Sequence, residues 1–268
     1  MTSQAYRGSV VGMDGYGGDQ IRAAERPHLE AGEPLMQRAA EGLAAVVSGL
    51  LDDPAVRPGE GPGSVLLLVG SGDNGGDALF AGARLAADGR HVTVLRVGSR
   101  VHGAGLAAAL AAGATLLDDP DDDRSADDLA GAADILRAAE AHGSTRLAAI
   151  AAEAALEADL VLDGILGIGV HGAAPLRSPA REVVGAVREL ARDQRAPFVV
   201  AVDVPSGIDV DTGGIADDHV LQADVTVTFG GVKAGLLRGP GATLAGRIEL
   251  VDVGIGAELA AMEPLVRS

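Results

Sequence analysis

The chain has 268 residues, of which 47% are hydrophobic and 22% charged, and its formal net charge is -17 at pH 7. These values are typical of a folded protein with room for one α/β domain or two small ones. An acidic chain of this kind would repel phosphate polymers and anionic lipid, which excludes non-specific binding to nucleic acid or membrane. Cysteine is absent, so disulfides, thiolate metal sites and a cysteine nucleophile are excluded.

The N-terminal residues 1–18 are glycine-rich and aperiodic, and they predict a flexible extension before one domain over residues 19–268. A helix is expected from Asp19, interrupted near Pro27, with a second helix over residues 33–53. The first residues lack the basic and apolar segments of a signal peptide, and we expect a cytoplasmic protein. The longest apolar run, residues 104–117, is too short to span a bilayer.

The stretch that organises the chain runs from Val65 to Gly89. Five apolar residues predict a buried strand over residues 65–69, and an amphipathic run predicts a helix over residues 78–87. A loop with glycines at 70, 72 and 75 lies between them. Such a loop at a helix N-terminus suits a phosphate group, although in a glycine-rich chain a simple tight turn explains the spacing equally well.

The rest of the pattern alternates strands and helices. A strand over residues 91–97 completes a βαβ unit, which predicts a right-handed crossover and a parallel sheet. The acidic stretch 118–128 is interpreted as a solvated loop. Further strands are expected at residues 160–163, 198–203, 224–229 and 247–252, with helices at 105–112 and 179–192. The whole pattern predicts a doubly wound α/β domain.

Polar side chains follow three of these expected strands. In doubly wound sheets, ligands bind beyond the carboxyl ends of the strands, so these side chains converge if the strands are neighbours. Carboxylate, amide and hydroxyl oxygens together suit a hard cation better than zinc or copper. The side chains concerned are those of Asp73, Asn74, Asp77, Asp163, Asp203 and Ser206.

A dinucleotide dehydrogenase is an alternative, because its signature is a glycine loop after the first strand of a βαβ unit. Arg96 and Arg100 would then meet a 2′-phosphate. Against this interpretation, Asp73 and Asp77 would put carboxylates where the pyrophosphate lies. Asp73 could also simply cap the helix.

One basic residue stands out, since Lys233 is the only lysine among the 21 basic residues. In a chain that otherwise uses arginine, a single lysine can mark a place that needs a compact, titratable amine. Chance retention explains it equally well.

Four segments in order resemble the successive motifs of the NAD(P)H-hydrate epimerase family: GSGDNGGDALFAGARLA, DLVLDGILGIGVHG, VVAVDVPSGIDVDTG and TVTFGGVKAGLLRGPGA. The similarity extends from about Gln20, where QIRAAE and LMQRAA resemble the family's opening helices, to about Gly256. It implies a Rossmann-like three-layer α/β/α fold with a mainly parallel sheet. It also implies an isomerase of nicotinamide nucleotide repair that interconverts the R and S forms of hydrated NADH and NADPH (NADHX and NADPHX). A homodimer and a separate or fused NAD(P)H-hydrate dehydratase are implied as partners.

The resemblance also implies a potassium ion, with Asn74, Asp163 and Ser206 as its ligands. Asp203 is the implied catalytic residue, expected to give a proton to the substrate hydroxyl and later to take one back, with a pKa raised by burial. Residue 73 departs from the family pattern, which usually has asparagine there. The substrate-binding residues implied are Asp73, Asn74, Gly75, Gly76, Asp77, Gly167, Ile168, Gly169, Val170, His171, Gly172, Ala173, Asp203 and Lys233.

A second class of function stays open from the residues alone. A non-catalytic nucleotide-binding or protein-interaction module on the same fold would keep the glycine loops without turnover. Asp163 and Asp203 would then merely cap turns at strand ends, and Ser206 would be an ordinary turn residue.

Overall fold

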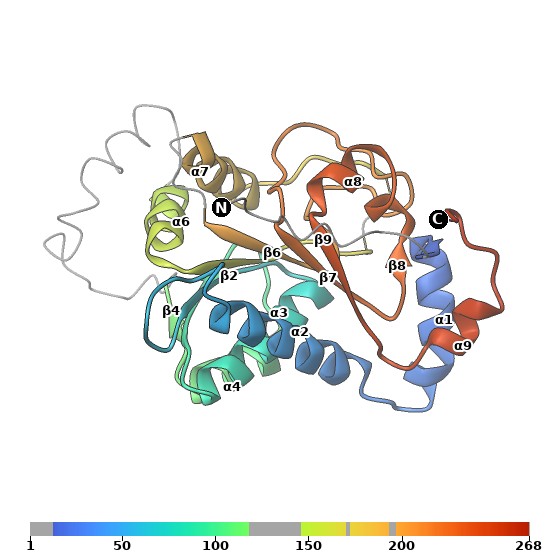
Figure 1. The fold of residues 1–268 in the computed structure, drawn as a ribbon, viewed down its shortest axis with the longest axis horizontal. Coiled ribbons are helices and arrows are strands. Elements are labelled where there is room, and N and C mark those ends of the chain that lie inside the picture. Colours follow the sequence, from blue (N-terminus) through green and yellow to red (C-terminus); the bar gives the residue numbers. More distant parts are fainter. Residues whose placement is uncertain (1–12, 118–145, 170–171, 193–196, 268) are drawn as a thin grey trace, which may run out of the picture.

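Seven parallel strands form the central sheet, in the order β4-β3-β2-β5-β6-β7-β9 (Figure 1). The computed structural model describes residues 13–117, 146–169, 172–192 and 197–267. The predicted doubly wound fold with a parallel sheet is confirmed. The strands of this sheet are β2 (Ser64–Val69), β3 (His91–Arg96), β4 (Thr115–Leu116), β5 (Leu160–Gly164), β6 (Phe198–Val202), β7 (Val225–Phe229) and β9 (Arg247–Val251).

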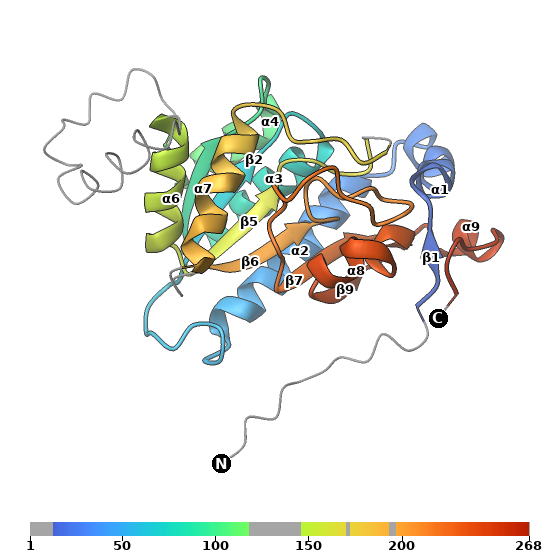
Figure 2. The same cartoon turned by 90° about the horizontal axis from the view of Figure 1, so that it is seen from above.

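Helices cover both faces of the sheet and make three layers, which Figure 1 shows stacked from top to bottom and Figure 2 shows from above. Alternate residues of β2 enter two different cores. Leu67 packs into the core under α2 and α3, whereas Leu66 and Leu68 pack into the core under α6 and α7. This division follows from the two-residue period of a strand that is buried on both faces. The covering helices are α2 (Leu35–Asp52), α3 (Asp73–Ala87), α4 (Gly103–Ala111), α6 (Arg146–Glu157) and α7 (Ala180–Arg192).

The strand order reverses at β2. From β2 the chain moves to β3 and β4 on one side, then returns to β5 on the other side. A crevice at the carboxyl ends of β2 and β5 is therefore the expected ligand site. The chain is tight here, because Gly70 N donates to Gly164 O at 3.0 Å, and a Cβ on Gly70 would overlap Ile165 O. Gly70 is thus needed for close packing of two strand ends.

The N-terminal prediction is wrong for part of its range. Gly15 and Tyr16 form β1, which pairs in parallel with β8 (Val232–Lys233), and α1 (Gly18–Glu30) follows directly. Residues 1–12 lie outside the described residues. The expected interruption at Pro27 is also absent: α1 continues to Glu30. The carbonyl that Pro27 leaves without a donor belongs to Ala23, an exposed residue where water can satisfy it.

The region after β7 is more structured than the glycine- and proline-rich turn that the sequence suggests. It holds β8, the 3₁₀ turn η1 (Ala234–Leu236) and α8 (Gly239–Leu244), and α9 (Gly256–Ala260) follows β9. The acidic stretch 118–128 lies outside the described residues. In the part of the chain that is described, no helix combines the length and apolar character needed to cross a membrane.

Candidate active site

Helix α3 begins at Asp73 and not at Ala78, so most of the predicted glycine loop is helical. Gly72 is its N-cap residue, and the alternative in which Asp73 caps the helix is wrong. Asp73 is exposed, whereas the following residues Asn74 to Asp77 are buried. Gly75 lies against the Gly70 carbonyl, where a Cβ would overlap it. The glycine spacing therefore lets the helix start close to the sheet.

Asn74 connects the ends of two strands. Its Nδ2 donates to Val202 O at 2.5 Å and to Leu166 O at 3.2 Å. Val202 ends β6, and Leu166 belongs to the loop after β5. A Cβ on Gly167 would overlap the Asn74 amide, so glycine at 167 leaves room for this side chain. Asn74 thus lies at the crevice where the strand order reverses.

Asp163 and Ser206 form a buried pair beside it. Ser206 Oγ donates to Asp163 Oδ1 at 2.6 Å, and Ser206 N donates to Oδ2 at 2.8 Å. Both residues have no exposed surface. Burial raises the pKa of Asp163, and the hydrogen bonds from Ser206 oppose that rise. Ser206 Oγ also lies 3.3 Å from Leu166 O, the carbonyl that Asn74 contacts.

The structure therefore brings together Asn74, Asp163 and Ser206, the three residues expected to bind a cation. Their side chains and two backbone carbonyls, Val202 O and Leu166 O, form a cluster of oxygen atoms. The NH₂ group of Asn74 donates hydrogen bonds to both carbonyls. Rotation of this amide by half a turn would exchange the NH₂ for the amide oxygen, which would join the carboxylate, the hydroxyl and the two backbone carbonyls as a fifth oxygen-bearing group. A hard cation would then suit the cluster, so the residues fit such an ion.

Asp203 follows β6 directly and is held by an unusual backbone. It is the only residue other than glycine with a positive φ, 68°, among those described. Aspartate tolerates this left-handed conformation better than most residues, and the conformation commonly occurs at functional sites. Its carboxylate forms a buried ion pair with Lys233, whose Nζ also donates to Phe229 O at 2.9 Å. Lys233 is only 1% exposed.

Every donor to Asp203 in the described part of the chain contacts the same oxygen, Oδ1. Besides Lys233 Nζ, Phe229 N donates to it at 3.1 Å and Thr228 Oγ1 at 3.2 Å. Among the described residues none donates to Oδ2, which leaves this oxygen available to a ligand. Because the carboxylate is paired with a buried ammonium, this arrangement favours a charged base at Asp203. The lone lysine thus has a specific place in the site.

Two further carboxyl groups lie near this pair. Burial, followed by the charges of Asp203 and Asp73, holds the pKa of Asp77 well above its usual range. Burial likewise raises the pKa of Glu25 on α1, and the charges of Asp203 and Asp73 add to this rise. Two carboxyl groups with raised pKa values, Asp77 and Glu25, thus lie beside the ion pair.

Helix α1 closes the site from the side, which the sequence analysis missed. The N–H of Gly18, the first residue of the helix, donates to Asp211 Oδ1 at 2.8 Å. One turn later Arg22 donates to Ile168 O at 2.6 Å, in the expected substrate loop. Glu25 follows on the same helical face. The signal in the sequence was the spacing of four and three residues between Gly18, Arg22 and Glu25, which places them on one face of a helix.

The expected substrate loop, residues 167–173, is only partly described. Gly167 and Ile168 are half-buried, whereas Gly169, Gly172 and Ala173 are exposed. The predictions for Val170 and His171 lie outside the described residues. The loop begins at the Asn74 amide, which places its first residues next to the oxygen cluster.

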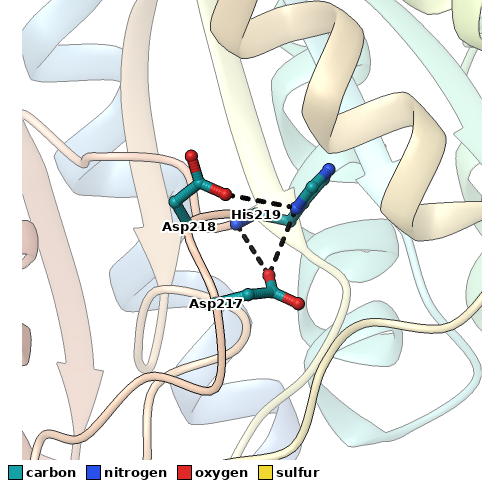
Figure 3. A group of neighbouring side chains, drawn as sticks. All are labelled: Asp217, Asp218 and His219. Atoms are coloured by element: carbon teal, nitrogen blue, oxygen red, sulfur yellow. Dashed lines mark hydrogen bonds and ion pairs between the residues drawn. The ribbon is translucent and has the colours of Figure 1, made fainter.

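A second polar group, Asp217, Asp218 and His219, lies in the loop between β6 and β7 (Figure 3). Its three ligand-type atoms are close enough to suggest a metal site. However, Arg181 donates to Asp217 at 2.5 Å, and Arg188 lies 3.3 Å from Asp218. Each carboxylate already has a cation as partner, and hydrogen bonding to Arg181 lowers the pKa of Asp217. The group therefore attaches this loop to α7.

The fold and the site define a doubly wound α/β protein with buried carboxylates at the switch point of its sheet. The family model "YjeF-related protein N-terminus" matches residues 32–235, and the chain belongs to this family. Similar proteins named NAD(P)H-hydrate epimerase occur in Clavibacter michiganensis, at 47% identity over 95% of this chain and 96% of that protein. Another, in Microbacterium testaceum, is 44% identical over 97% of this chain and 86% of that protein.

Two further comparisons concern a longer relative and a solved structure. A Mycobacterium tuberculosis protein named bifunctional NAD(P)H-hydrate repair enzyme Nnr is 38% identical over 90% of this chain, which covers 41% of that protein. The crystal structure of yeast ynu0 (YNL200c) matches with a TM-score of 0.61 at 19% identity, covering 83% of each chain. This structural likeness supports the fold.

Proposed function

We propose that this chain is an isomerase of nicotinamide nucleotide repair that interconverts the two C6 epimers of hydrated NADH and NADPH. The observation that carries the proposal is the 47% identity, over nearly the whole of both chains, to a protein named NAD(P)H-hydrate epimerase. The site supports it, because an ion-paired carboxylate and a second buried carboxyl group lie at the switch point of the sheet. Acid–base chemistry needs such groups.

The chemistry of the substrate explains the need for both an acid and a base. Its C6 carries a hydroxyl group next to the ring nitrogen. Once this hydroxyl is protonated, the nitrogen lone pair expels water and leaves an iminium ion. Water then adds to C6, the π electrons return to nitrogen, and the adding water loses a proton to a base. Asp203 Oδ2 is our candidate for that base, with Lys233 orienting the carboxylate.

Asp203→Asn tests the proposal. Purified NADHX epimers, separated by chromatography, should interconvert at least about 100-fold more slowly with this variant, because general bases contribute roughly that much or more. Dinucleotide binding should persist. A double variant, Asp203→Asn with Lys233→Met, leaves no unpaired buried charge and should also be folded and inactive.

The measurement also separates the two classes of function. A non-catalytic binding module would bind the nucleotide and show no turnover in the unsubstituted chain. Epimerisation that survives in both folded variants would contradict the role of Asp203. Circular dichroism shows whether each variant is folded.

We also propose a potassium ion bound by Asn74, Asp163 and Ser206. When bound, the ion would supply fixed positive charge beside the phosphates of the substrate. Potassium chloride should raise Tm relative to choline chloride at equal ionic strength, by about 5–10 °C at 100 times the Kd. Asn74→Ala should abolish the difference. Equal Tm values in the two salts would contradict the site.

Partners of the chain are proposed from the family resemblance. A homodimer is expected, which light scattering would detect. The product of epimerisation would be passed to an NAD(P)H-hydrate dehydratase, either separate or fused. The bifunctional name of the Mycobacterium tuberculosis relative supports a link between two repair activities.

A further inference from the structure

Asp77 is a buried carboxyl group with an unsatisfied oxygen atom. It is 6% exposed, and within the described part of the chain its Oδ1 has no hydrogen-bond partner. No described residue donates to it, in contrast to Asp203, whose Oδ1 receives three donors. A buried ionised carboxylate without donors is strongly unfavourable, whereas the protonated form needs fewer partners and can itself donate. The two aspartates are thus suited to opposite protonation states.

The direction of Asp77 follows from its place on α3. It lies one turn after Asn74, on the same face of the helix. Asn74 reaches the carbonyl of Val202, the residue before Asp203. This face of α3 is therefore directed at the end of β6, and Asp203 is the largest charged contributor to the environment of Asp77.

We propose that Asp77 holds the proton in this site and donates it to the departing C6 hydroxyl of the substrate, while Asp203 acts as the base. This inference rests on the proposed epimerase function and assigns the acid within it. It replaces the expectation that Asp203 performs both steps.

The groups around Asp77 support a held proton. Besides burial, the charges of Asp203, Asp73 and Glu25 raise the pKa of Asp77, and the charge of Lys233 opposes them. His102 lies beside Gly76 in the same turn, but its Nδ1 accepts from Gly105 N at 3.0 Å. Lys233 is already committed to Asp203. The charge balance therefore favours a neutral Asp77.

The proton balance closes over one turnover. Asp77 transfers its proton to the C6 oxygen, the C–O bond breaks with its electron pair on oxygen, and water leaves. A second water forms the new C–O bond and gives a proton to Asp203. Asp203 returns that proton to solvent, and Asp77 regains one from solvent. The net change is inversion at C6, and no oxidant or reductant is needed.

Asp77→Asn tests the assignment, with Asp88→Asn as a matched control at the exposed C-terminal end of the same helix. Steady-state kinetics with purified NADHX epimers across pH give kcat and KM. In the unsubstituted enzyme kcat/KM should fall at alkaline pH as Asp77 loses its proton. Asp77→Asn should lower kcat by about 100-fold or more with little change in KM, and this alkaline fall should disappear. The control should match the unsubstituted enzyme.

A readout independent of turnover accompanies the kinetics. Carbon-13 NMR of aspartate carboxyl groups should show one protonated carboxyl at pH 7, absent in Asp77→Asn and present in Asp88→Asn and Glu25→Gln. The assignment would be overturned if Asp77→Asn kept its kcat or still showed the alkaline fall in kcat/KM. It would also be overturned if Glu25→Gln, and not Asp77→Asn, lost the alkaline fall or the NMR signal of the protonated carboxyl. An unsubstituted enzyme without epimerisation would refute the proposed function and the proton transfer together, and the NMR signal would still decide which carboxyl holds the proton.

Discussion

Replacing Lys233 with methionine is expected to lower the free energy of unfolding by about 3–5 kcal/mol, because removing one partner of a buried ion pair leaves the other charge buried alone. Lys233 is almost fully buried, and it holds both the Asp203 carboxylate and the Phe229 carbonyl. Methionine fills a similar volume, so a cavity contributes little. Urea denaturation followed by circular dichroism measures the change, provided that the m value stays constant.

Two controls separate the buried charge from the loss of a side chain. The double variant Lys233→Met with Asp203→Asn removes both charges and should recover most of the lost stability. Arg267→Met removes the cation of an exposed ion pair with Glu263 and should change stability much less. A double variant no more stable than Lys233→Met alone would show that the buried charge is not the cause.

The fold could be predicted because its signals are local. Runs of apolar residues indicated the strands β2, β5, β6 and β7. Apolar residues that recur at helical spacing indicated the helices α2 and α7. The start of α3 could not be predicted, because Gly75 and Gly76 disfavour a helix in isolation. Packing against Gly70, Met36 and His102 makes the helical start favourable.

The site could be predicted only in part. Polar residues at the ends of parallel strands indicated that Asn74, Asp163 and Ser206 converge, and the structure places them together. The pairing of Asp203 with Lys233 depends on β1 and β8, two-residue strands too short to give a pattern. The neighbourhood of Glu25 depends on how α1 packs. Protonation states therefore needed the tertiary structure, since they depend on burial and on charges from distant parts of the chain.

Asp77→Asn is expected to stabilise the protein at neutral and alkaline pH while it removes activity. The pKa of Asp77 is raised in the folded state by burial and by the charges of Asp203 and Asp73. Below the ordinary carboxyl pKa, both folded and unfolded chains hold the proton, and the raised pKa has no effect on stability. As pH rises above that value, the unfolded chain loses the proton while the folded chain keeps it. The free energy of unfolding therefore falls until the folded chain also ionises.

Asparagine removes this loss, because it resembles the protonated carboxyl in shape and stays neutral. At pH 8 the free energy of unfolding of Asp77→Asn should thus exceed that of the unsubstituted protein by about 0.5–2 kcal/mol, a gain typical of stabilising substitutions, and its Tm should be higher. The two Tm values should converge below pH 4. A variant less stable than the unsubstituted protein at pH 8 would contradict this prediction, because it would mean that Asp77 is ionised and stabilised in the folded chain. Stability and activity are opposed at this position because the buried carboxyl that destabilises the fold at neutral pH is the group suited to give a proton to the substrate.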